Sequence, residues 1–495
     1  MTDTSRRQFL RTAAFGTLTA AAAAASVTNA AAAPAESAQG NAPYDLIILG
    51  AGCGGLVCAV RAAQNGLKPL LIEKMPMPSG NTIYAAGFML GIHTAQQKGI
   101  NDADTVDAFY EDMIKVSQGH GDKALTRKLA ESCDSMMAWL ADYVGIQFSK
   151  PAKLVWPMLS RAHLVLGEVK PGGGQLAKQL LAKAKELGVE VRFNTKGIAL
   201  LTDEKTGAVT GARIKDKTGI SEVRSKYGVV IATGGFSANQ QLVTQYIGSA
   251  GAKMPIRGSR IIMGENIRLV DPLFAKVVNV DQYHCGPIHG PTGANPLNIV
   301  NNGICVNKKA ERFTDEGQTY VQMSRDVAAM TPDNWAYMVC DQNTRDIPIL
   351  QPDFASYERT KAPIYKGNTI EEAAKAAGLD PEKLEKTVAE YNAAVKADTR
   401  AQLTPKNTLV KAPLIEKAPF YIVPFQGGMT ATFGGPLIDV NGRVRDTENK
   451  PIEGLFAIGN ASGGIFYDNY IGGAQLTGAA VFGIAVADYV KSLKG

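Results

Sequence analysis

The stretch that decides the fold is Leu46-Ile47-Ile48-Leu49-Gly50-Ala51-Gly52-Cys53-Gly54-Gly55, which leads into the small and apolar residues 56 to 63. The apolar run predicts a buried parallel strand, and the segment after the glycines predicts a helix packed close to the sheet. Gly50 permits a tight turn, Gly52 lets backbone approach a pyrophosphate, and Gly55 allows close helix packing. We therefore expect an α/β, Rossmann-like fold with a dinucleotide bound at Gly50, Gly52, Cys53, Gly54 and Gly55.

A second apolar run, residues 69 to 72, ends in Glu73. This position is about 20 residues beyond the glycines, where a carboxylate can accept hydrogen bonds from both hydroxyls of a ribose. The alternative, a solvated charge at the end of a strand, stays open at this point. We include Lys74 and, further along the chain, Gly197 in the predicted cofactor site.

Two later segments repeat the junction between a buried strand and a glycine turn, at residues 228 to 236 and 454 to 464, and a small-residue helix follows at 472 to 480. One nucleotide does not need three such junctions, whereas a large two-part cofactor lying across the sheet does. We therefore predict FAD rather than NAD. The further residues assigned to its site are Ala232, Thr233, Gly234, Gly235, Gly459, Asn460, Gln475 and Leu476.

Together with Ser79-Gly80-Asn81-Thr82 and Ala85-Ala86-Gly87, these segments resemble the soluble fumarate reductase and flavocytochrome c flavoproteins, a family that also contains the 3-ketosteroid Δ1-dehydrogenases. The resemblance covers nearly all of residues 44 to 490. It implies noncovalent FAD contacted by Gly80, Asn81, Thr82, Ala86 and Gly87. It also implies an FAD-binding domain at 43–282, an inserted α+β clamp domain at 283–428, and a return to the FAD-binding domain at 429–495.

The family's clamp motif is similar to residues 311 to 319, and the position of its catalytic arginine then falls on Tyr320. A shift of five residues places Arg325 there instead, so both residues stay candidates. A family histidine pair corresponds to Thr430-Ala431, and a substrate-binding arginine corresponds to Tyr470. His284 keeps a polar family position in the cleft. Because two cation positions are neutral, the resemblance disfavours fumarate as the substrate.

The tyrosines at these positions are similar to those of the ketosteroid dehydrogenase branch. By that resemblance Tyr470 and the N–H of Gly473 or Ala474 polarise a conjugated carbonyl, and Tyr320 exchanges a proton. The first hypothesis is reduction of an activated C=C bond of an enone or enoate. The second is a flavin dehydrogenase that introduces a double bond next to a ketone. The third is a noncatalytic flavoprotein that only transfers electrons.

The first residues predict export. Arg6-Arg7 stand ahead of an Ala-rich run that ends near Ala31-Ala32-Ala33, which is the order of a twin-arginine signal peptide over 1–33, and residues 34–42 suit a linker. The run is too weakly apolar for a stable membrane span. This route carries folded proteins, so it favours a periplasmic protein with a cofactor inserted before export.

Composition limits the partners. The net charge of +6 is spread along the chain, without the basic clusters that bind nucleic acid. Six cysteines, including Cys53 and Cys305, suit buried small side chains, and five scattered histidines do not predict a metal site. Because the sequence contains no Cys-x-x-Cys-His motif for c-type haem, we expect electrons to pass through a separate c-type cytochrome or quinone-linked protein, with a small molecule as substrate.

Residues 369 to 397 predict a helical hairpin interrupted at Gly378-Leu379-Asp380-Pro381.

Overall fold

The computed structural model describes residues 43–151, 157, 159–168 and 170–494, so the predicted signal peptide and linker lie outside the described residues. A six-stranded sheet has the order β17-β18-β9-β1-β2-β5. Its central strand β1 pairs in parallel with β2 and β9, and β9 pairs in parallel with β18. The strands are β1 (Leu46–Leu49), β2 (Pro69–Ile72), β5 (Glu190–Arg192), β9 (Val229–Ile231), β17 (Arg443–Arg445) and β18 (Pro451–Ala457). The sheet therefore joins segments from both halves of the chain.

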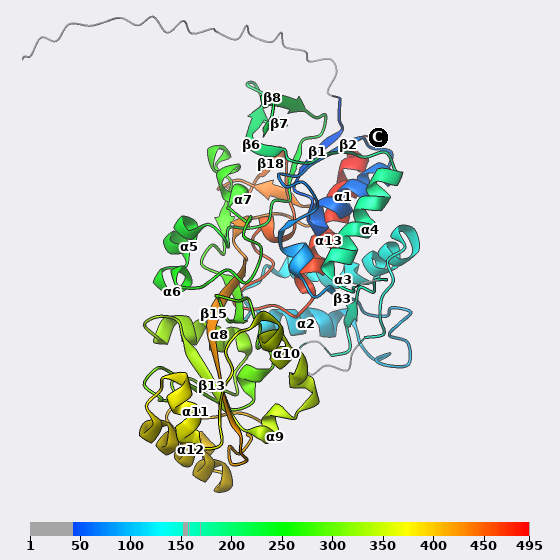
Figure 1. The fold of residues 1–495 in the computed structure, drawn as a ribbon. Coiled ribbons are helices and arrows are strands. Elements are labelled where there is room, and N and C mark those ends of the chain that lie inside the picture. Colours follow the sequence, from blue (N-terminus) through cyan, green and yellow to red (C-terminus); the bar gives the residue numbers. More distant parts are fainter. Residues whose placement is uncertain (1–42, 152–156, 158, 169, 495) are drawn as a thin grey trace, which may run out of the picture. The chain divides into compact units, whose positions relative to one another are not determined.

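Two helices far apart in the sequence pack against each other beside this sheet, α1 (Cys53–Gln64) and α13 (Ala474–Leu493) (Figure 1). Their contact is close because Gly54 and Gly483 lack side chains: a Cβ on Gly483 would lie 2.8 Å from the Gly54 carbonyl oxygen. Helix α4 (Gly173–Glu186) also packs on α1. Among the described helices, α13 alone has the length and apolar composition of a membrane span, but its packing on α1 is that of a core helix.

A second, antiparallel sheet has the order β11-β15-β13-β12, with β14 paired to β15. Its helices include α8, which packs on β11 and β15, and the hairpin of α11 and α12. The bounds are β11 (Tyr283–Ile288), β12 (Ile304–Val306), β13 (Ala336–Cys340), β14 (Tyr365–Gly367), β15 (Phe420–Thr432), α8 (Tyr320–Met330), α9 (Gln342–Arg345), α10 (Gln351–Thr360), α11 (Ile370–Ala377) and α12 (Pro381–Lys396). The limits 282/283 and 428/429 of the clamp stay a prediction, and β15 runs across the second of them.

Smaller elements complete the described chain. Sheets are formed by β6 (Lys196–Thr202), β7 (Val209–Asp216) and β8 (Gly219–Arg224), by β3 (Phe88–Leu90) with β4 (Ala162–Leu164), and by β10 (Val277–Val278) with β16 (Gly435–Pro436). The remaining α-helices are α2 (Val106–Val116), α3 (Lys123–Trp139), α5 (Gln240–Tyr246), α6 (Ser249–Ala252) and α7 (Glu265–Arg268).

The structure shows where the sulfur atoms and the potential metal ligands of the described residues lie. All six cysteines are free and buried, as expected of small apolar side chains. Within the described residues no three His, Cys, Asp or Glu side chains are grouped closely enough to hold a metal ion. The buried Arg161 instead forms ion pairs with Asp104 and Asp112, both at 2.6 Å, and so ties β4 to the segment before α2 and to α2 itself.

Candidate active site

A cavity of about 650 Å³ extends from the carboxyl ends of β1, β2 and β9 to β11 and α8. It is lined by every residue assigned above to the cofactor site except Gly55 and Gly235, and by His284, Tyr320 and Tyr470. The position agrees with the general rule that ligands of open α/β sheets bind outside the carboxyl ends of the strands. The predicted cofactor residues and three of the four catalytic candidates therefore face one space.

The two glycines outside the lining have packing roles. A Cβ on Gly55 would lie 1.9 Å from the carbonyl oxygen of Gly50, so only glycine lets α1 begin directly against the turn that follows β1. A Cβ on Gly235 would lie 2.1 Å from the Thr432 hydroxyl oxygen, which accepts a hydrogen bond from the Phe236 N–H at 3.0 Å. Gly55 thus has the packing role expected from its position, and Gly235 allows β15 to approach the end of β9.

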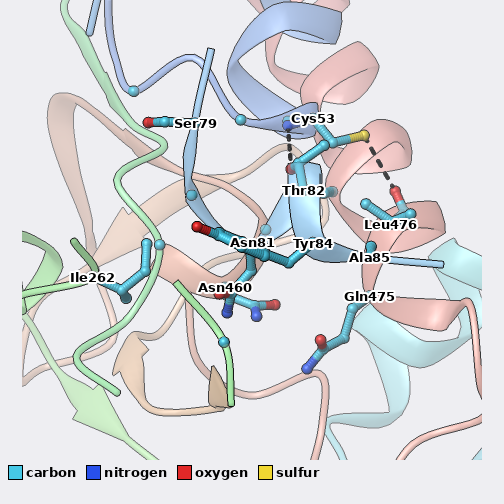
Figure 2. A pocket seen from close by; sticks show the side chains of 18 of the residues that line it. Cys53, Ser79, Asn81, Thr82, Tyr84, Ala85, Ile262, Asn460, Gln475 and Leu476 are labelled. Carbon is cyan, nitrogen blue, oxygen red and sulfur yellow. Dashed lines mark hydrogen bonds between the residues drawn. The ribbon is translucent and has the colours of Figure 1, made fainter. Parts of the chain in front are cut away.

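The N-terminus of α1 faces the cavity and is built to receive an anion. Gly52 stands at the N-cap without a side chain to cap the helix, and the Cys53 N–H donates to the Thr82 hydroxyl at 2.9 Å. Figure 2 shows this bond and the contact between the Cys53 sulfur and the Leu476 carbonyl oxygen at 3.7 Å. The first N–H groups of a helix have no partner within the helix, so those that follow the Cys53 N–H can bind the diphosphate of FAD.

Glu73 is buried rather than solvated, with 4% of its surface exposed, which rules out the solvated alternative for this residue. One carboxylate oxygen accepts from the Ala51 N–H at 2.9 Å, and the other accepts from the Met75 N–H and the Ser79 hydroxyl, both at 2.9 Å. These donors fix the carboxylate at the cavity wall. The oxygen bonded only to Ala51 can still accept a further hydrogen bond, so the group fits a ribose hydroxyl of FAD.

Lys74 forms an ion pair with Glu265 at 2.8 Å, and Lys196 reaches the same carboxylate at 3.0 Å. Burial raises the pKa of Glu265, but the hydrogen bond and charge of Lys74 outweigh burial and the net shift is downward. Glu265 lines the cavity, and its second oxygen is buried without a partner among the described residues. The sequence interpretation missed Glu265 because no motif marks the start of the short helix α7.

Two further amides bear on the fit of FAD. The Asn81 side chain donates to the Thr430 carbonyl at 3.0 Å and accepts from the Ser259 N–H at 2.7 Å, so it holds three segments of the cavity wall together. Gln475, in the first turn of α13, lines the cavity (Figure 2), and its buried Nε2 has no partner in the part of the chain that the structure describes. An unsatisfied buried donor indicates an absent acceptor, which the polar edge of a flavin ring can supply. The residues present therefore fit FAD.

His284, Tyr320 and Tyr470 form an aromatic cluster in the cavity wall. The His284 and Tyr470 rings have centroids 4.7 Å apart, and His284 and Tyr320 meet edge to face at 5.9 Å. The Tyr320 hydroxyl lies 3.5 Å from His284 Nε2, and His284 Nδ1 is buried without a partner among the described residues. The cluster joins β11, α8 and the segment before α13.

The protonation states in this cluster follow from burial. Burial lowers the pKa of His284 well below its ordinary value, and the charges of Arg257 and Arg325 lower it further. Burial raises the pKa of Tyr320 and of Tyr470, and Arg257 opposes both increases. At neutral pH the histidine is therefore uncharged and both tyrosines keep their protons.

The structure separates the two alternatives for residue 320 or 325. Tyr320 lines the cavity, whereas Arg325 forms an ion pair with Asp468 and donates to the Tyr283 carbonyl at 2.9 Å, away from the cavity lining. The structure also bears on which backbone N–H, that of Gly473 or that of Ala474, is free to act together with Tyr470. The Ala474 N–H is already bonded to the Ile471 carbonyl at 2.8 Å, so Gly473 remains the candidate.

Arg257 is a site residue that the sequence interpretation missed. It lines the cavity, and its Nη1 donates to the Thr430 hydroxyl at 3.0 Å. It comes from the loop between α6 and α7, which pairs with β15 through a bridge between Ile256 and Met429. Thus a cation enters the cleft from a segment outside the motifs, beside a threonine that stands where the resemblance has a histidine. No local signal marks Arg257 in the sequence.

The comparisons with known proteins place the chain in a family. Residues 45–476 match the family of the FAD binding domain, so this chain belongs to that family and is an FAD-dependent oxidoreductase. "Probable fumarate reductase Ifc3" of Shewanella frigidimarina is 28% identical over 92% of this chain and 75% of its own length. "Urocanate reductase" of Eggerthella lenta is 28% identical over 89% of this chain and 73% of its own length.

Solved structures agree with this assignment. The open conformation of a flavocytochrome c3 fumarate reductase matches with a TM-score of 0.79 and 26% identity, over 91% of this chain and 78% of that one. A 3-ketosteroid Δ1-dehydrogenase from Sterolibacterium denitrificans matches with a TM-score of 0.78 and 21% identity, over 91% and 99% of the two chains. The second likeness concerns the fold. The expected α/β architecture and the resemblance to both groups of proteins are thereby confirmed.

Proposed function

We propose that this protein reduces an activated C=C bond of a small enone or enoate, other than fumarate, with electrons from an external redox partner. The observation that carries the proposal is the cluster of His284, Tyr320 and Tyr470 in the wall of the cavity that the FAD-binding residues also line. Relatives that include a urocanate reductase support this class of reaction. FAD, when bound, supplies hydride chemistry at the substrate carbon.

The protein's own residues contribute positioning, polarisation and a proton. In this proposal Tyr470 and the N–H of Gly473, which line the cavity, donate hydrogen bonds to a conjugated oxygen and lower the cost of the charge that develops there. Tyr320 is placed to deliver a proton to the carbon next to that oxygen, and its neighbour His284 is uncharged and able to accept a hydrogen bond from it. His284 is buried and the two tyrosines are half-buried, and electrostatic interactions are stronger in such surroundings than in bulk water.

The dehydrogenase direction is the second candidate, favoured by the two tyrosines at positions that resemble those of ketosteroid dehydrogenases. In that direction Tyr320 has to lose its own proton before it accepts one from the carbon next to a ketone, which its raised pKa disfavours. The same geometry serves both directions, and the redox partner decides between them. Noncatalytic electron transfer is the third candidate. In that case no small molecule accepts the electrons of the flavin.

Export and partner form part of the same proposal. The order of Arg6-Arg7, Ala-rich run and small residues supports export through the twin-arginine pathway to the periplasm. A carrier such as a c-type cytochrome or a quinone-linked protein then supplies electrons, since nicotinamide nucleotides are scarce outside the cytoplasm. Fractionation of cells that produce the full chain tests the location. Retention of Arg6→Lys/Arg7→Lys protein in the cytoplasm is the expected result, and unchanged export would contradict it.

The activity test uses purified FAD-loaded protein, reduced methyl viologen under anaerobic conditions, and a panel of enones, enoates and ketosteroids. Oxidation of the dye by an alkene of the panel is the expected result. The opposite pattern, no dye oxidation with any alkene and dye reduction by a saturated ketone, would establish the dehydrogenase direction instead. No reaction in either direction would favour the noncatalytic candidate.

A further inference from the structure

We propose that Arg257 binds a single carboxylate of the substrate, so that the protein acts on α,β-unsaturated monocarboxylates rather than on dicarboxylates or uncharged ketones. This inference rests on the proposed function, because it names the substrate class of the same site. It starts from a guanidinium that lines the cavity and has no carboxylate within ion-pair distance among the described residues. Other arginines that are buried or half-buried, such as Arg161 and Arg312, form ion pairs with carboxylates.

Two glycines leave the space that the Arg257 side chain occupies. A Cβ on Gly286 would lie 2.9 Å from the Arg257 Cζ, and a Cβ on Gly428 would lie 3.2 Å from the Arg257 Cβ. Two glycines on neighbouring strands, β11 and β15, therefore leave the room that the side chain occupies. The Arg257 backbone N–H donates to the Met429 carbonyl at 2.7 Å, which fixes the start of the side chain. The guanidinium is thus held in place by the fold.

Only part of the donor capacity of Arg257 is used within the protein. Nη1 donates to the Thr430 hydroxyl at 3.0 Å. In the amide orientation that satisfies both groups, the Asn295 oxygen accepts from Nη2 at 3.3 Å. Nε is buried and has no partner among the described residues. A guanidinium has five N–H donors, and a carboxylate is the acceptor that matches its geometry best. The positive charge of Arg257 and its unused N–H donors both favour binding of an anion.

The rest of the cleft limits that anion to one carboxylate. Thr430 and Asn295, which contact Arg257, carry no charge, and His284, Tyr320 and Tyr470, which line the same cavity, are uncharged at neutral pH. A second carboxylate among them would be desolvated without a cation, which is costly. An uncharged ketone would leave the guanidinium in the cavity without an anion. An enoate with a flat, uncharged substituent on its β-carbon satisfies both requirements, because the rings supply an apolar wall.

The reaction on such a substrate balances. One hydride and one proton add across the C=C bond, R–CH=CH–COO⁻ becomes R–CH₂–CH₂–COO⁻, and the two electrons come from the external carrier of the proposed function. Negative charge grows on the carboxylate as hydride reaches the β-carbon, and Arg257 stabilises it there. Tyr320 supplies the proton to the α-carbon. Arg257 therefore binds the ground state and contributes further in the transition state.

The test measures binding to the oxidised, FAD-loaded full chain by perturbation of flavin absorbance. The probes are acrylate, cinnamate, their methyl esters and fumarate, and the variants are Arg257→Met, Arg257→Lys and the exposed neighbour Arg260→Met as matched control. We expect the best monocarboxylate to bind the wild type at least about tenfold more tightly than its ester. Arg257→Met should lose that preference, Arg257→Lys should keep part of it, and Arg260→Met should keep all of it.

Equal affinity of every acid and its ester in the wild type overturns the inference, and this comparison needs no variant to fold. Unchanged cinnamate or acrylate binding in Arg257→Met also overturns it, as does fumarate binding tighter than either monocarboxylate. Binding is measured without turnover, so the proposed function is judged separately. Acid-selective binding with no reduction of any alkene refutes the proposed function, whereas equal reduction of acids and esters refutes only the role of Arg257.

Discussion

The hydroxyl of Tyr320, at the start of α8, lies 3.5 Å from Nε2 of His284 on β11. If Tyr320 is the proton donor, Tyr320→Phe should lower turnover by about 100-fold to 10,000-fold, because it removes the proton and little else. The FAD content and flavin absorbance spectrum should not change. Steady-state rates with reduced methyl viologen and the best alkene measure the effect.

The control is Tyr337→Phe, which removes a hydroxyl from the half-buried side chain on β13 outside the cavity lining and should leave the rate unchanged. Full activity in Tyr320→Phe, with loss of activity in Arg325→Ala, would show that the arginine is the residue that acts.

Glu73 should control the affinity for FAD. Glu73→Gln removes the negative charge that faces the ribose of FAD. It also puts an amide donor against the N–H group of Ala51 or Met75, each of which donates to the carboxylate. We expect the Kd of FAD to rise by about 10-fold to 100-fold, the effect of losing a hydrogen bond to a charged group. Titration of apoprotein with FAD, followed by flavin fluorescence, gives the Kd. The exposed Glu222→Gln on β8 is the control, and equal Kd values for the two variants would refute the assignment.

Gly55 should not tolerate a side chain. Gly55→Ala would place a Cβ 1.9 Å from the Gly50 carbonyl oxygen, which is backbone and cannot move away cheaply. The expected destabilisation is about 3 kcal/mol or more, above the usual range for overpacking, together with loss of FAD. Gly174→Ala in α4, whose nearest atom would be at 3.9 Å, should be neutral or stabilising by about 0.5 kcal/mol. Chemical denaturation measures both, and equal stability would contradict the packing argument.

Stability should fall as the pH drops below about 6.5, partly because of His284. Its folded pKa is depressed by burial, so the unfolded chain binds a proton that the folded chain refuses. The contribution is fully present above the unfolded pKa and is lost as the pH falls toward the folded pKa, at about 1.4 kcal/mol per pH unit for one group. The pKa values of His163 and His289 are also lowered by burial and add in the same direction.

Urea unfolding between pH 7 and pH 5 measures the dependence of stability on pH. His284→Gln should show a shallower slope than the wild type, whereas the exposed His120→Gln should not. Identical slopes for His284→Gln and the wild type would mean that His284 is not held neutral in the folded state.

Local sequence was enough to predict the parts of the fold that local chemistry determines. The strand, glycine turn and helix at residues 46 to 64 form because of neighbouring residues. The hairpin of α11 and α12 is likewise marked by the Thr369 N-cap, the left-handed Gly378 and the Asp380 N-cap before Pro381. That Tyr320 lines the cavity and Arg325 does not could be seen only in the structure. Five residues along a helix turn the side chains about 140° apart, so they face different surroundings.

Arg257 and Glu265 could not be predicted from the sequence for a different reason. They enter the cavity from a loop and a one-turn helix whose positions depend on distant contacts, the bridge of Ile256 with Met429 and the ion pair of Lys74 with Glu265. Neither contact leaves a periodic pattern or a motif. The positions where the resembling family has cations hold neutral residues in this sequence. The folded chain instead brings a cation, Arg257, into the cavity from a different segment.

The most direct test of the central claim is anaerobic mixing of photoreduced, FAD-loaded protein with the panel of enones and enoates. We expect at least one α,β-unsaturated compound to reoxidise the flavin faster than it reoxidises when no compound is added, and we expect Tyr320→Phe to slow this step. A flavin that stays reduced with every alkene, or an oxidised flavin that is instead reduced by a saturated ketone, would contradict it.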